Sequence, residues 1–130
     1  MNTISVKAVL RMAALDEKRL GKSALGSYNV YIGPHIRREC FETSEELHDL
    51  FVETFGPSCD AGYRHVDLSE ALITQLTQAG ISRERICDLG LCTVCHTDEF
   101  FSYRAQQGTA GRHGAFAYRE KRAKSESCDL

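Results

Sequence analysis

The sequence is most distinctive between residues 92 and 104, where it reads Cys92-Thr93-Val94-Cys95-His96-Thr97-Asp98-Glu99-Phe100-Phe101-Ser102-Tyr103-Arg104. Together with the segment 108–112 that follows, it gathers two thiols, an imidazole, three aromatic rings and two arginines within about twenty residues. No other part of the chain has this density of reactive side chains. The rest of the sequence is therefore interpreted outward from it.

The two thiols of this stretch admit several interpretations. The spacing Cys92-x-x-Cys95 is typical of a redox or metal half-site in an intracellular protein, and with His96 it also matches the c-type haem attachment pattern. Both cysteines can equally be small buried residues near the end of a strand. His96 can be a loop histidine that hydrogen-bonds locally. The three residues are weak candidates for metal ligands.

Residues 100–106 alternate between two kinds of side chain. Phe101 and Tyr103 are expected on one buried face and Ser102 and Arg104 on the other, which predicts a strand. The glycines that follow mark a turn into another predicted strand over 113–118.

Arginine suits the bidentate binding of phosphate or carboxylate, although an arginine on a strand can also simply be solvated. Phe101 can belong to the core or stack on a base. The candidate substrate-binding residues are Arg104, Arg112, Ser102 and Phe101.

Three helices are predicted upstream of this stretch. Apolar residues at helical spacing predict one over 3–16, followed by a loop over 18–27. Thr43 and Glu46 form a capping box for the second, and Asp67 caps the third, which ends at Gly80. The expected buried stripe of the second helix consists of Leu47, Leu50, Phe51 and Phe55.

Further strands are predicted over 28–32 and 86–91, giving the order helix, strand, helix, helix and three strands. This order indicates an α+β (mixed α/β) domain in which helices pack on a mixed sheet. The domain is expected to cover 1–118, and 119–130 to be a charged flexible tail.

Composition excludes several classes of protein. The 130 residues, 42% hydrophobic and 26% charged, suit one small globular domain. A net charge of −2 gives no electrostatic case for nucleic acid or an anionic membrane, and no apolar run approaches the ~20 residues that span a bilayer. Without a secretory signal, the six cysteines are expected to be reduced and the protein cytoplasmic.

The central stretch resembles the C-terminal signature of the YfiH family, also called laccase-domain or multicopper polyphenol oxidase-like proteins. Two further matches lie upstream: Ile32-Gly33-Pro34 followed by Cys40-Phe41-Glu42, and Val66-Asp67-Leu68 at a helix start. The matching residues of the signature are Cys92, Thr93, His96, Asp98, Phe100, Phe101, Ser102, Tyr103, Arg104, Gly111 and Arg112. At three positions, His35, Ala105 and Ala110, the residue differs from the one that is usual in the family.

The resemblance implies half of a layered α/β/β/α fold and a metal-dependent purine nucleoside phosphorylase that binds a purine nucleoside and phosphate. Adenosine deaminase activity is also assigned to the family, and older annotation calls its members polyphenol oxidases. Zn or Cu is the cofactor that the resemblance implies for a complete family domain.

Family members hold the metal on a His, a Cys and a His from three upstream motifs, none of which occurs here. Two imidazoles and a thiolate bind the metal at three positions and leave the fourth open for water or substrate. This chain is expected to lack that metal centre. The chain is therefore expected to be a fragment, inactive alone, and prone to self-association or to pairing with a complementing N-terminal half. The alternative is a non-enzymatic remnant or a small Zn-binding module that uses Cys92, Cys95 and His96.

Overall fold

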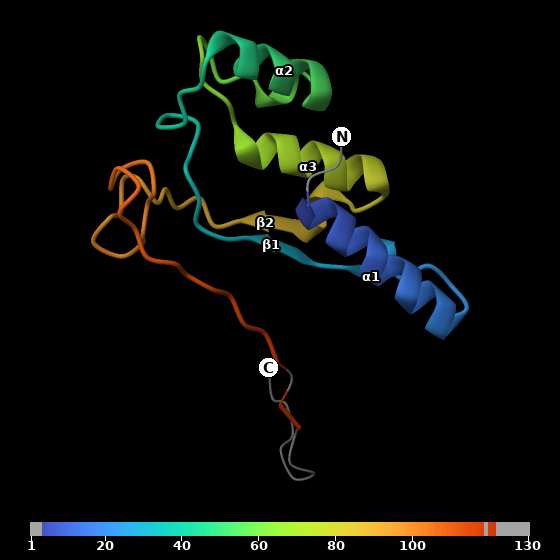
Figure 1. Ribbon diagram of the computed structural model, residues 1–130. Helices are drawn as coiled ribbons and strands as arrows, with labels where there is room; N and C mark the ends of the chain where they lie inside the picture. The colour runs from blue at the N-terminus through green and yellow to red at the C-terminus, as the bar shows by residue number, and fades with distance from the viewer. Residues whose placement is uncertain (1–3, 119, 122–130) are drawn as a thin grey trace.

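Three helices and two short strands form the regular structure of residues 4–118, 120 and 121, the part of the chain that the computed structural model describes (Figure 1). The elements are α1 (Ile4–Leu20), β1 (Val30–Ile32), α2 (Glu45–Phe55), α3 (Leu68–Ala79) and β2 (Ile86–Asp88). Single 3-10 turns lie at Leu25–Ser27, Pro57–Cys59 and Arg83–Arg85. The predicted mixed α+β class is confirmed. Most of the predicted tail, residues 119 and 122–130, lies outside the described part.

Helix α1 is longer than predicted. It continues to Leu20, four residues past the expected end, because the residues after Asp16 are good helix formers. Gly21 then takes φ 71°, and its N–H donates to the Glu17 carbonyl, which ends the helix. The predicted buried face is confirmed by Val6 and Ala13, whose side chains are 1% and 8% exposed.

The sheet consists of β1 and β2, which pair in parallel with Val30 opposite Ile86 and Ile32 opposite Asp88. Parallel strands need a crossover, and here α2 and α3 provide it. The pairing resumes beyond the strands at a bridge between His35 and Cys92. Two chain segments 57 positions apart are thereby held side by side past the carboxyl ends of the strands.

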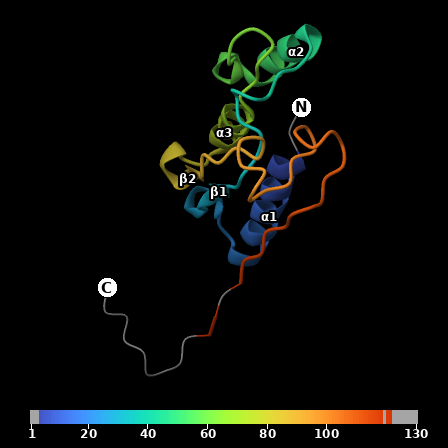
Figure 2. The ribbon, with the colours of Figure 1, turned by 90° about the vertical axis from the view of Figure 1, so that its left-hand side faces the viewer.

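Helix α3 lies between α2 on one side and α1 with the sheet on the other (Figures 1 and 2). Asp67 caps its start by accepting from the Glu70 N–H, and Gly80 ends it in the left-handed region at φ 116°, both as predicted. One side of α3 contributes Leu76 to a core cluster with Val6 and Ile81. The other side contributes Ala71 to a second cluster, with Phe55 and Cys59.

Helix α2 differs from its prediction in two ways. Its N-cap is Ser44, which accepts from the Leu47 N–H, and not Thr43, whose hydroxyl instead donates to the Arg64 carbonyl. The expected stripe is only half buried, since Leu47 and Leu50 are 40% and 53% exposed. The helix packs against α3 and the Pro57–Cys59 turn, and Leu47 and Leu50 remain partly exposed.

The prediction of two strands over 100–106 and 113–118 is wrong. Residues 103–108 form turns, with Gln107 and Gly108 at φ 53° and 83°, and residues 109–118 have no regular structure. Ser102 and Gln106 decide this locally: the Ala105 N–H donates to Ser102 Oγ, and the Ser102 N–H donates to Gln106 Oε1. Side chains that bond the nearby backbone compete with strand pairing.

In the described part of the chain, no helix is long and apolar enough to cross a membrane.

Candidate functional site

Two tight turns meet just past the carboxyl ends of β1 and β2. In the first, the N–H groups of Cys40 and Phe41 donate to the Arg37 carbonyl; in the second, the His96 N–H donates to the Cys92 carbonyl. The bridge between His35 and Cys92 fixes the two turns against each other, because the Thr93 N–H also donates to the His35 carbonyl at 3.1 Å. Ligands in open α/β sheets bind in this position, outside the carboxyl ends of parallel strands.

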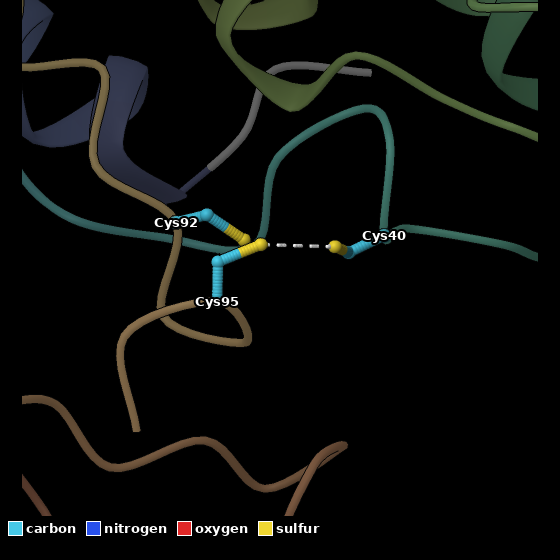
Figure 3. A group of neighbouring side chains, drawn as sticks. All are labelled: Cys40, Cys92 and Cys95. Carbon is cyan, nitrogen blue, oxygen red and sulfur yellow. Dashed lines mark hydrogen bonds between the residues drawn. The ribbon is translucent and has the colours of Figure 1, made fainter. Parts of the chain in front are cut away.

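Three cysteine side chains from these turns point toward one another (Figure 3). The Sγ atoms of Cys40 and Cys95 are 3.6 Å apart, and those of Cys40, Cys92 and Cys95 all lie within 4.8 Å of one another. Cys92 is buried, Cys40 half-buried and Cys95 exposed, so the group opens to solvent on one side. We refer to Cys40, Cys92 and Cys95 as the thiol cluster.

The thiol cluster has an uneven distribution of acidity. The hydrogen bond with Cys95, reinforced by burial and by Cys92, raises the pKa of Cys40 to about 12. Burial by itself raises the pKa of Cys92, but backbone N–H groups at Arg37, Cys95 and Val94 favour its thiolate and lower the net pKa to about 7. Cys92 therefore becomes an anion more readily than Cys40.

A network of polar side chains joins the first turn to α3 and β2. The Arg37 guanidinium donates to Ser69 Oγ at 2.9 Å and to Asp88 Oδ2 at 2.6 Å, and Ser69 Oγ lies 2.8 Å from His35 Nε2. The network joins the loop after β1, the start of α3 and the end of β2. It fixes the backbone that carries Cys40 and Cys92.

A pocket of about 340 Å³ opens beside the same turns. It contains three of the residues that the sequence nominates for substrate binding: Phe101, Ser102 and Arg104. The remaining lining residues are Pro34, His35, Ile36, Phe41, Thr93, Tyr103 and His113. Thr93 follows Cys92 directly, so the pocket and the thiol cluster share one chain segment. We refer to this space as the aromatic pocket.

Arg104 is held in a defined position in the aromatic pocket. Its Nη1 donates to the Glu42 carbonyl at 2.8 Å, and the guanidinium carbon lies 5.4 Å from the centre of the Phe41 ring. This geometry is a cation–π contact plus one hydrogen bond, and a guanidinium has five N–H donors. The side chain can therefore hold an anionic oxygen without leaving its place.

Three residues of the 101–104 segment have the opposite exposure to that predicted, whereas Arg104 is exposed as expected. Ser102 is 5% exposed, whereas Phe101 and Tyr103 are 49% and 72% exposed, because a turn replaces the strand. Ser102 lines the aromatic pocket, but its Oγ accepts from the Ala105 N–H and thereby shapes the turn. The Phe101 ring lies against the backbone of Gly111, where an added Cβ would be 2.7 Å from two ring carbons.

Two candidates lie apart from these groups. Arg112 is exposed, and its Nη1 donates to the Gly111 carbonyl at 3.3 Å; it does not line the aromatic pocket. His96 follows Cys95 directly but its ring is not part of the thiol cluster. His48 has 14% of its side chain exposed and lies between Asp49 and Asp60.

Sequence reasoning missed Cys40 as a partner of Cys92 and Cys95. The available signal was its place in the motif that follows Gly33-Pro34, but no local pattern joins positions 55 residues apart. It also missed the network of Arg37, Ser69 and Asp88, whose members come from three separate segments.

Comparisons with known proteins match most of this chain to one family. Residues 2–120 match the family described as multi-copper polyphenol oxidoreductase laccase. The protein named purine nucleoside phosphorylase YlmD of Geobacillus stearothermophilus is 33% identical over 99 residues, which cover 71% of this chain and 36% of that protein. A Staphylococcus aureus protein of the same name is 34% identical over 116 residues, covering 85% of this chain and 41% of the relative.

The human protein named purine nucleoside phosphorylase LACC1 is 35% identical over 86 residues, or 57% of this chain. The crystal structure of YlmD from Geobacillus stearothermophilus superposes with a TM-score of 0.63 at 28% identity, covering 79% of this chain and 40% of that one. The chain thus spans less than half the length of these relatives.

Proposed function

Because this chain belongs to the multi-copper polyphenol oxidoreductase laccase family, we propose that it forms the C-terminal part of a purine nucleoside phosphorylase. The relatives that carry this name support the reaction class, in which phosphate displaces the purine base of a nucleoside. Adenosine deamination, the second activity that the resemblance implies, belongs to the same proposal.

The observation that carries the proposal is the position of Arg104 in the aromatic pocket. A guanidinium held by Phe41 and the Glu42 carbonyl can bind a phosphate oxygen through its remaining N–H groups. The exposed ring of Phe101 on the same pocket offers a surface on which a purine can stack. Ser102 contributes by fixing the turn that presents both side chains.

The residues described here do not form the His, Cys and His metal site that the family resemblance implies. The His, Cys and His set expected from the resemblance has no counterpart in the motifs of this sequence. Among residues 4–118, 120 and 121, the group able to hold an ion consists of three thiols without an imidazole. We propose that the chain alone does not catalyse phosphorolysis.

The cellular compartment is part of this proposal. All five cysteines in the described part of the chain are free thiols, although two of them have their sulfur atoms 3.6 Å apart. Unpaired cysteines at this density suit a reducing compartment, which supports a cytoplasmic location.

The test is a chimaera in which this chain replaces the matching segment of the Geobacillus relative. Phosphorolysis of inosine is expected from the chimaera and not from the purified 130-residue chain. In the chimaera, Arg104→Lys should raise the KM for phosphate roughly tenfold, because an ammonium group cannot reproduce the planar set of donors of a guanidinium. A tenfold increase corresponds to a loss of ~1.4 kcal/mol of phosphate-binding free energy.

Arg83→Lys serves as the control, since Arg83 is an exposed arginine paired with Glu70 and neither residue lines the aromatic pocket. Its phosphate KM should equal that of the parent chimaera. A folded chimaera that lacks phosphorolysis, or one in which Arg104→Lys leaves the phosphate KM unaltered, would contradict the proposal.

A further inference from the structure

The thiol cluster is not explained by the proposed phosphorylase chemistry. It combines three cysteines that the fold brings together from two separate turns, with no carboxylate or imidazole among them. Soft thiolate ligands select soft or borderline cations over Mg²⁺ or Ca²⁺. Three thiolates therefore favour an ion such as Zn²⁺ over Mg²⁺ or Ca²⁺.

The distances fit a tetrahedral zinc ion. A Zn–S bond of about 2.3 Å places neighbouring sulfur atoms of a tetrahedron about 3.8 Å apart. Cys40 and Cys95 are 3.6 Å apart, and the third sulfur lies within 4.8 Å of both. All three sulfur atoms are therefore within about 1 Å of the separations that a tetrahedral ion requires.

The surroundings favour a bound ion over a disulfide. The Cys40 and Cys95 sulfur atoms are well beyond the bond length of about 2.05 Å, and a disulfide between them would leave Cys92 unpaired. The exposed side, next to Cys95, leaves the fourth position open to water or another ligand.

We propose that Cys40, Cys92 and Cys95 form a zinc site with three thiolate ligands and one open position. On binding, each thiol loses its proton and the ion replaces the hydrogen bonds between the sulfur atoms. The site ties the turn after β1 to the turn after β2, next to the aromatic pocket. None of its three ligands belongs to the His, Cys and His set that the family resemblance implies.

The experiment is titration of the fully reduced chain with Zn²⁺, with Co²⁺ as a spectroscopic substitute. We expect one ion per chain, thiolate-to-cobalt charge-transfer absorption and tetrahedral d–d bands. Zn²⁺ should raise the melting temperature, because the ion binds the folded state in preference to the unfolded one. Cys95→Ser, at an exposed position, should weaken Zn²⁺ binding at least about a hundredfold, since loss of outer-shell groups alone costs about 10–100-fold.

Cys87→Ser is the matched control, because Cys87 is an exposed cysteine on β2 that is not part of the thiol cluster. It should retain the stoichiometry, the cobalt spectrum and the shift in melting temperature. Cys40→Ser provides a second cluster variant if Cys95→Ser unfolds. Equal binding by Cys87→Ser and Cys95→Ser, a cobalt spectrum without charge-transfer bands, or no binding by the reduced chain would each overturn the site. None of these results bears on phosphorolysis by the chimaera, which is measured separately.

Discussion

The Arg37 guanidinium donates a hydrogen bond of 2.6 Å to the Asp88 carboxylate, joining the loop after β1 to the last residue of β2. About a fifth of each side chain is exposed, at 21% and 19%, so water screens the pair only partly. The two residues are 51 positions apart. The bond therefore holds together the two segments that carry the thiol cluster.

Loss of this contact should destabilise the fold. Arg37→Met keeps an apolar side chain of similar length but leaves the Asp88 carboxylate without its cation, so the free energy of unfolding should fall by about 1.5–3 kcal/mol. Urea denaturation measures the change. Arg83→Met provides the comparison, because its pair with Glu70 has the arginine side chain 63% exposed and should contribute under about 1 kcal/mol. Equal effects of the two substitutions would show that the Arg37 contact has no special weight.

The same pair predicts how stability depends on pH. Burial alone would raise the pKa of Asp88, but hydrogen bonds from Arg37, Ser69 and the Gly90 N–H lower it below its ordinary value. A carboxylate whose pKa is lower in the folded state contributes stability that is complete above its unfolded pKa of about 3.9 and is lost as the pH falls through the folded value.

The midpoint of urea unfolding should accordingly decrease between about pH 5 and pH 3. Asp88→Asn should be less stable at pH 6 and should show a shallower decrease toward pH 3. The pKa of Asp60 is also lowered, by the Gly62 N–H and His48, so part of the decrease should persist in this variant. A slope unchanged by Asp88→Asn would contradict the assignment.

The exposed apolar side of α2 predicts self-association of the isolated chain. Leu47 and Leu50 are 40% and 53% exposed on one helix, and each strand of the sheet pairs on one side only within the described residues. Apolar patches and open strand edges promote association between chains. Sedimentation velocity should show dimers or larger species as the concentration rises, and Leu50→Gln should shift the distribution toward monomer.

Glu53→Gln, at an exposed position on the same helix, tests whether removal of a charge has a similar effect. It should leave the association unchanged or increase it. A wild-type chain that stays monomeric across the tested concentrations, with a sharp cooperative melt, would count against the prediction.

The helices were largely predictable because their signals are local. Asp67 and Gly80 lie within one turn of the ends they set, and the apolar spacing of Val6 and Ala13 follows from the helical period alone. Errors at helix boundaries have the same local origin. Ser44 and Thr43 are both good caps, and which of them is used depended on whether Thr43 could reach the Arg64 carbonyl, 21 residues away.

The sequence by itself determined the family, the helix order and the chemistry available at residues 92–104, since these depend on residue identity and short-range spacing. The tertiary structure leaves the predicted strand over 100–106 without a partner strand, so the local hydrogen bonds of Ser102 and Gln106 prevail and residues 103–108 form turns. It also decided that Cys40 joins Cys92 and Cys95. That meeting depends on the parallel register of β1 and β2 and on the His35 bridge to Cys92, and both are contacts between residues more than 50 positions apart.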